Sequence, residues 1–226
     1  MKKISFDIVT ASSLAACVLL AACSGNGDDS PRLPVVQNIV EYAGTSEGCT
    51  AFIYYAPGSD NAEELRSRGG FAADDLAQGD ALLLSYTSDP ADPGYITVTG
   101  ARGINNMALL QTEPAGLAGW DSEGVYLLSA WRAGQRLNLR LNLTYDSEPR
   151  RFAIIVDKTT IDDPWPVAYL FHRRGTETPN FSREYYVSCP LTPLFSRDGI
   201  EGLKLRLIDT NTPSALPEER TLTFPK

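Results

Sequence analysis

The chain has 226 residues, and its 20 lysines and arginines are outnumbered by 28 aspartates and glutamates, which gives a net charge of −8. This balance argues against nucleic acid as a partner, because affinity for phosphate backbones comes largely from lysine and arginine. The length suits one large domain or two of modest size.

The N-terminal residues 1–22 are typical of a secretory signal peptide. A basic start at Met1–Lys3 precedes an apolar run from Ile8 to Ala22, and the chain turns polar immediately afterwards. The apolar run is too short for a convincing transmembrane helix. We therefore expect residues 1–22 to be cleaved from the mature protein.

The signal peptide ends in Leu20-Ala21-Ala22-Cys23, which closely resembles the bacterial lipobox. Small residues fit the signal peptidase, and the thiol of Cys23 takes the diacylglyceryl group. We predict lipidation at Cys23, a flexible tether over residues 23–34 and anchoring in an envelope membrane, with the outer membrane expected and its face left open. A second Leu-Ala-Ala-Cys ends at Cys17, but Asp7 would then interrupt an already short apolar region.

Beyond the tether, the sequence predicts an all-β protein. The clearest strand lies in residues 135–145, where Leu137, Leu139, Leu141 and Leu143 alternate with polar residues, so that one side should be core and the other should face water. The only plausible helix is about two turns at residues 60–68, with Glu63 and Glu64 in its first turn. Further strands are predicted at 35–42, 49–55, 81–87, 95–99, 104–110, 152–156, 167–171, 203–207 and 221–224.

Two β domains are expected. Residues 113–120 are small and flexible and coincide with a shift in charge, so they are the best linker. This divides the mature chain into a β domain at 35–112 and a second at 121–226. The runs at 152–156 and 167–171 are apolar throughout, as in strands covered on both faces.

The order of these features resembles the NigD-like lipoproteins. The resemblance rests on the lipobox, on Gln78–Tyr86 entering a central strand, on Tyr95–Val98 and on the later strand at Leu137–Leu141. It implies an N-terminal OB-like small barrel followed by a C-terminal antiparallel β-sandwich. It also implies an association with bacteriocin gene clusters, in which an immunity role was suggested. The sequence has Tyr55–Gly58 where the family more typically has a DDG turn, and the family supplies no active site.

No catalytic or metal-binding signature is present, and no cofactor is expected. His172 is the single histidine, which excludes metal sites with two histidines, and we expect it to be exposed at a strand end. Adjacent acids such as Asp162-Asp163 point to opposite faces of a strand, so they cannot flank one glycosidic bond, and they lack the spacing of a calcium loop. Cys49 and Cys189 leave one long-range disulfide possible, although a lone buried cysteine usually acts as a small hydrophobe.

Aromatic residues are the best candidates for binding. Tyr185 and Tyr186 should point to opposite faces of a strand, and Trp165 lies between two prolines in an acidic loop. We predict Trp165, Tyr185 and Tyr186 to contribute to a partner-binding surface, against the plain alternative that they cover sheet edges. The predicted function is a non-enzymatic envelope lipoprotein that binds a protein, with toxin immunity as one version. A glycan-binding accessory lipoprotein is the alternative, and a hydrolase is a remote one.

Overall fold

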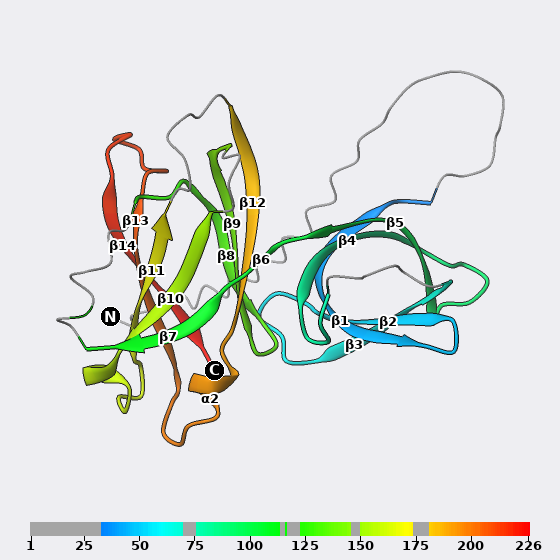
Figure 1. Cartoon of the computed structure of the whole chain (residues 1–226), viewed down its shortest axis with the longest axis horizontal. Helices are drawn as coiled ribbons and strands as arrows, with labels where there is room; N and C mark the ends of the chain where they lie inside the picture. Colours follow the sequence, from blue (N-terminus) through cyan, green and yellow to red (C-terminus); the bar gives the residue numbers. More distant parts are fainter. Residues whose placement is uncertain (1–32, 70–75, 114–115, 117–122, 146–149, 174–180) are drawn as a thin grey trace, which may run out of the picture. The chain divides into compact units, whose positions relative to one another are not determined.

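The computed structural model describes residues 33–69, 76–113, 116, 123–145, 150–173 and 181–226, which lie in one compact unit spanning Leu33–Lys226. The predicted signal peptide and Cys23 lie outside the described residues. The fold is all-β, as the sequence predicts (Figure 1). No helix among these residues has the length and apolar character needed to cross a membrane. The elements are β1 Val36–Ser46, β2 Cys49–Tyr55, β3 Ala62–Arg68, β4 Ala81–Ser88, β5 Tyr95–Gly103, β6 Asn105–Asn106, β7 Ala108–Thr112, β8 Leu127–Ala133, β9 Arg136–Thr144, β10 Arg151–Asp157, the 3₁₀ turn η1 Lys158–Thr160, β11 Val167–Arg173, β12 Ser182–Pro190, α2 Thr192–Phe195, β13 Gly202–Asp209 and β14 Glu218–Pro225.

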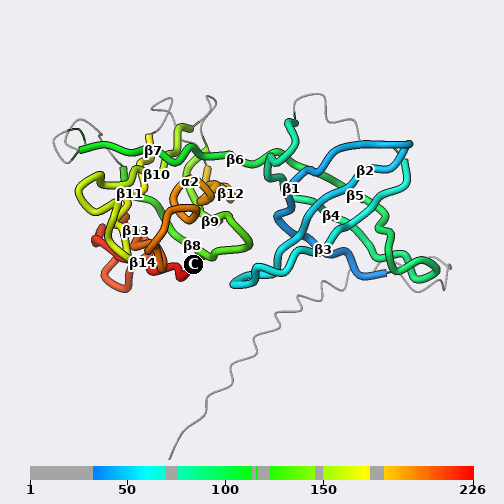
Figure 2. The backbone as a smooth tube through the Cα atoms, turned by 90° about the horizontal axis from the view of Figure 1, so that it is seen from below, coloured from blue at the N-terminus to red at the C-terminus, as the bar shows by residue number. Residues whose placement is uncertain are grey.

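The first five strands form a closed barrel in the order β1-β2-β3-β5-β4, and Figure 2 shows β1, β2 and β3 side by side. All neighbours are antiparallel except β3 and β5, which pair in parallel. This arrangement confirms the expected small barrel. Its interior is filled by buried apolar side chains, namely Val40, Phe52, Leu65, Leu82, Leu84, Tyr86 and Ile96.

The predicted helix at residues 60–68 is wrong, because this segment forms strand β3. All seven residues of β3 pair with β2, and only Leu65 and Ser67, two residues apart, are buried. That spacing is the period of a strand. The first-turn glutamates at 63 and 64 favour a helix locally, but the segment offers no apolar helical face, so the place for Leu65 in the barrel core decides the outcome.

The remaining strands form a β-sandwich. One sheet has the order β14-β13-β11-β10-β7 and the other has the order β6-β12-β9-β8. The sheets are mixed, where an antiparallel sandwich was expected, because β7–β10, β11–β13 and β6–β12 pair in parallel. The four leucines of β9 at 137, 139, 141 and 143 point into the core between the sheets, as predicted. Cys189 is buried there, and both Cys49 and Cys189 are free thiols.

The predicted boundary between the domains requires a correction. Strand β6 pairs with β12, and β7 pairs with β10, so residues 105–112 belong to the sandwich and not to the first domain. The reason is burial, since Met107 and Leu109 pack into the sandwich core. The barrel therefore ends with β5 at Gly103. Most of the predicted linker at 113–120 lies outside the described residues.

The polar face of β9 is also different from the prediction at one end. Arg136 and Asn138 were expected to face water, but they are only 8% and 2% exposed. The Arg136 guanidinium donates to Ser188 Oγ at 2.7 Å, to the Gly79 carbonyl at 3.0 Å and to Asn106 Oδ1 at 2.8 Å. Burial lowers the pKa of Arg136. This arginine thus joins the sandwich strand β9 to the barrel segment that precedes β4.

A second contact joins the barrel to the β8–β9 turn. Arg132, which is 7% exposed, forms an ion pair with Asp60, and its Nη2 lies 3.0 Å from Asp60 Oδ2. The hydrogen bond from Arg132 lowers the pKa of Asp60. Gly134 has a φ of +54°, and the ring of Tyr55 occupies the space that a Cβ at position 134 would need.

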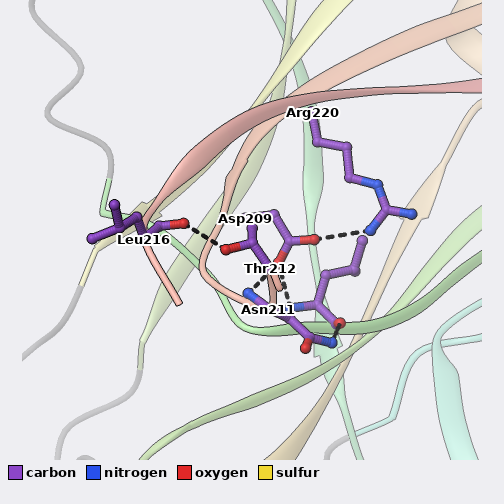
Figure 3. A network of polar contacts seen from close by, with 6 residues as sticks. Asp209, Asn211, Thr212, Leu216 and Arg220 are labelled. Atoms are coloured by element: carbon purple, nitrogen blue, oxygen red, sulfur yellow. Dashed lines mark hydrogen bonds and ion pairs between the residues drawn. The ribbon is translucent and has the colours of Figure 1, made fainter. Parts of the chain in front are cut away.

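A buried carboxylate fastens β13 to the segment leading into β8 (Figure 3). Asp209 is 1% exposed, and its Oδ1 accepts the backbone N–H groups of Leu127 at 3.2 Å and Asn211 at 2.8 Å. Its Oδ2 accepts a hydrogen bond from Arg220 Nη1 at 2.9 Å. The Asn211 side chain completes the arrangement by donating to the Leu127 carbonyl at 2.7 Å.

Candidate functional site

Strand β12 positions the aromatic residue with the strongest claim to a binding role. Strand β12 pairs with β9 along nine residues, and this register places Tyr186 directly opposite Arg140. The inward residues of β9 are leucines, so Arg140 and Tyr186 share the outer face of the sheet. Glu184, two residues before Tyr186, lies on the same face.

These three side chains are held together by charge and hydrogen bonds. Arg140 donates to both carboxylate oxygens of Glu184, at 3.0 Å from Nε and 2.6 Å from Nη2, while the Tyr186 hydroxyl donates to Oε2 at 3.3 Å. The guanidinium carbons of Arg102 and Arg140 lie 5.4 Å and 5.8 Å from the centre of the Tyr186 ring. Both distances lie within the range for cation–π attraction.

The electrostatics follow from this geometry. Hydrogen bonding by Arg140 lowers the pKa of Glu184, so this carboxylate stays ionised, and the same bond raises the pKa of Arg140. Burial raises the pKa of Tyr186. The hydroxyl therefore remains protonated at neutral pH and acts as a hydrogen-bond donor. We call Arg102, Arg140, Glu184 and Tyr186 the Tyr186 surface.

The Tyr186 surface borders a cavity of about 350 Å³. One wall is formed by Glu184 and Tyr186, and the other comes from strands β1, β4 and β5, including Gln37, Ser85 and Arg102. Gln37 donates to Ser85 Oγ at 3.2 Å. A half-buried ring beside fixed charges and amide groups is equipped for recognition, because tyrosine and arginine are enriched at the energetic centres of protein interfaces.

Tyr185 points the other way from Tyr186, as the alternation predicts. It packs against the core of the sandwich, with the guanidinium carbons of Arg183 and Arg150 at 5.2 Å and 5.4 Å from its ring centre. The two tyrosines therefore do not form one surface. A binding role for Tyr185 stays a prediction, and its packing favours a structural one.

Trp165 lies apart from both tyrosines. It is half-buried, its ring covers Gly202 at the start of β13, and its indole Nε1 donates to Glu201 Oε2 at 3.2 Å. The contacts of Trp165 are with the residues that open β13, whereas those of Tyr186 are with β5 and β9. The structure does not bring the predicted residues together, and a partner-binding role for Trp165 stays a prediction.

His172 was expected to be exposed, and this is wrong, because it is 1% exposed. Its Nε2 lies 2.7 Å from Nη1 of Arg150, its Nδ1 lies 3.4 Å from the Glu123 carbonyl, and its ring stacks on Phe152 at 5.0 Å. Since arginine can only donate, Nε2 must accept. The imidazole therefore connects Arg150 with the Glu123 carbonyl inside the sandwich.

The charged partners of Tyr186 were not predicted from the sequence. Arg140 stood in the expected water-facing row of its strand, and Glu184 stands two residues before Tyr186, so the period of two contained the signal. Arg102 comes from the barrel, and no local pattern points to it. Among the described residues, no three histidines, cysteines or acids gather as metal ligands, and Asp162 is instead paired with Arg197.

Comparisons with known proteins place the fold. No known family profile matches the chain, and no curated protein matches it. Among solved structures, a NigD-like immunity protein from Bacteroides caccae superposes with a TM-score of 0.61 at 17% identity, covering 84% of this chain and 93% of that one. The chain has the fold of this NigD-like protein.

Other solved structures share the NigD-like fold. A protein of unknown function from Bacteroides vulgatus gives a TM-score of 0.66 at 16% identity, over 85% of this chain and 91% of that one. A candidate lipoprotein from Bacteroides fragilis gives 0.62 at 12% identity, over 85% and 98%. These identities establish a shared fold, and the predicted resemblance is confirmed at that level.

Proposed function

We propose that the chain is a non-enzymatic lipoprotein of the cell envelope that binds a protein partner through the Tyr186 surface. The observation that carries this proposal is the half-buried Tyr186 ring between Arg102 and Arg140, beside a cavity and a fixed carboxylate. A ring and an ion pair that are already in place lose little side-chain entropy when a partner binds.

Membrane attachment is proposed to run through acyl chains on Cys23, with the outer membrane as its site. The lipobox at residues 20–23 supports this, as does the shared fold with the candidate lipoprotein from Bacteroides fragilis. The specific version of the function is immunity, in which the bound protein is a toxin. It is supported by the shared fold with the immunity protein from Bacteroides caccae.

The proposal can be tested by photo-crosslinking in cells. A benzoylphenylalanine placed at Tyr186 should give one dominant protein adduct in envelope fractions. The matched control is the same residue at Tyr126, a tyrosine that is 40% exposed elsewhere on the sandwich. The adduct should be absent from the control and should be reduced by Arg140→Gln.

Equal adducts from positions 126 and 186, or none from position 186, would contradict the proposed surface. Binding to a polysaccharide array that is lost in Tyr186→Ala and kept in Tyr126→Ala would point to the glycan-binding alternative instead. A bacteriocin gene beside the gene for this protein would favour the immunity version, and glycan-transport genes there would disfavour it.

A further inference from the structure

A second cavity, separate from the Tyr186 surface, lies at the β7 edge of the five-stranded sheet. Its volume is about 750 Å³, which is within the usual range for small-molecule pockets. Three neighbouring strands supply its wall, through Ala108 and Leu110 of β7, Ala153 of β10 and Phe171 of β11. These residues share the face of the sheet opposite to Ile154 and Leu170, which point into the sandwich core.

The same face carries two arginines in an unfavourable position. Arg151 and Arg173 are directly opposite each other in the β10–β11 register, both are exposed, and both line the cavity. Side chains at such positions have their Cβ atoms about 5 Å apart, and like charges there are destabilising. Within the described part of the chain, neither arginine has an ion-pair partner. An anion between them would relieve the repulsion.

A third arginine, Arg150, also contributes to the lining of the cavity, although its guanidinium is turned toward His172 and Tyr185. Arg150 is 6% exposed, and its two Nη groups bind His172 and the main chain and hydroxyl of Thr144. Its buried Nε has no hydrogen-bond acceptor, and no carboxylate pairs with this guanidinium among the residues that the structure describes. A buried charge without a counter-ion is costly. Three arginines therefore line the cavity on a protein that is acidic overall.

The lining next to the arginines is partly apolar and also includes the amides of Asn105 and Asn106. Phe171 and Ala153 are buried with Ile155 in a small cluster on this face, and Leu110 and Ile104 extend the apolar lining toward the barrel. We propose that this cavity binds a small organic anion whose carboxylate or phosphate head lies between Arg151 and Arg173, with an apolar body on Phe171 and Leu110. This inference is independent of the function proposed for the Tyr186 surface.

The test uses the full chain carrying Cys23→Ser, purified without detergent, and isothermal titration calorimetry with three probes. Octanoate has a charged head and an apolar tail, octanol has only the tail, and inorganic phosphate has only the charge. Octanoate should bind about tenfold more tightly than either of the others, since a charge-assisted contact is worth about one order of magnitude in affinity.

Arg151→Gln and Arg173→Gln should each weaken octanoate binding about tenfold, and Arg173→Lys should keep more of the affinity than Arg173→Gln. The matched control is Arg206→Gln, because Arg206 lies in the same sheet but stacks on Tyr169 and pairs with Glu219 at 4.0 Å. It should leave octanoate binding unchanged.

Melting without ligand provides an independent readout. If the two arginines repel each other, Arg173→Gln should not lower the melting temperature and should raise it slightly, while losing affinity. Octanol binding as tightly as octanoate, an equal loss of affinity in Arg206→Gln, or no octanoate binding at all would overturn the proposal. If inorganic phosphate binds as tightly as octanoate, the proposal that the ligand has an apolar body is overturned, because the charged group alone would then account for binding.

Discussion

Replacing Asp209 by alanine should destabilise the protein more than replacing its charged partner. Asp209 accepts two backbone N–H groups and one guanidinium, and alanine removes all three acceptor contacts. The N–H of Leu127 belongs to a residue that is 4% exposed, so it finds no water, and an unsatisfied buried donor costs about 1–3 kcal/mol. The N–H of Asn211 belongs to an exposed residue and can be hydrated, at a cost of about 1 kcal/mol.

The expected loss for Asp209→Ala is therefore about 3 kcal/mol, which lowers the melting temperature of a unit of this size by about 6–12 °C. Arg220→Gln should cost less than Asp209→Ala, because the Arg220 side chain is 53% exposed and the carboxylate keeps its two backbone N–H donors. Asp209→Asn should fall between the two, since one oxygen still accepts the backbone donors while the ion pair is lost.

Thermal and urea denaturation measure these differences, and hydrogen exchange at the Leu127 amide locates them. Exchange there should accelerate in Asp209→Ala and stay near the parent rate in Arg220→Gln. A cost for Arg220→Gln as large as that for Asp209→Ala would refute the reasoning, because it would make the ion pair, and not the bound backbone groups, the main contribution. So would an Asp209→Ala variant that melts within about 2 °C of the parent.

Four further predictions concern ionisation, thiols, anchoring and nucleic acid. Burial raises the pKa of Glu41 above its ordinary value of 4.5, so the unfolded chain releases this proton at lower pH than the folded protein does. The parent should therefore lose stability relative to Glu41→Gln as the pH rises from 4.5 through the raised pKa. A difference in urea midpoint between the two proteins that stays constant with pH would contradict this. Burial raises the pKa of Cys189 to about 12, so iodoacetamide should modify Cys49 in the native protein and spare Cys189 until unfolding, as peptide mass spectrometry can show. Cys23→Ser should abolish palmitate labelling and release the protein from membranes, whereas unchanged labelling would point to Cys17. Finally, the protein should not retain single-stranded DNA or RNA at physiological salt, and a salt-sensitive micromolar affinity would show that the charge argument fails.

Patterns with a period of two predicted most of the fold. The alternating leucines of β9 fixed which face lies in the core, and the opposite directions of Tyr185 and Tyr186 followed from the same rule. The predictions that were wrong concern residues whose surroundings come from segments distant in the sequence. Arg136 is buried among residues outside its own strand, and its guanidinium donates to Gly79, Asn106 and Ser188. No local pattern contains such information.

The candidate site was predicted in part for the same reason. Tyr186 was identified as an aromatic residue on an outer face, but its partner Arg102 is separated from it by most of the sandwich sequence. The wrong prediction for His172 has the same cause. A histidine at a strand end is usually exposed, but this one is buried by contacts that include Arg150 and the Glu123 carbonyl, which are distant in sequence. In β3, the helix-favouring glutamates are outweighed by the burial of Leu65 in the barrel core, which requires a strand.

The short strands β6 and β7 impose an order on folding. The barrel uses only residues before 104, so it can close before the rest of the chain has folded. Strands β6 and β7 must wait for β12 and β10, which arrive dozens of residues later. Until then the backbone N–H and C=O groups of the β6–β7 segment are unpaired, and they can form strand pairs with other chains. A chaperone that binds extended segments would have its best substrate there, in a protein whose first domain is already folded.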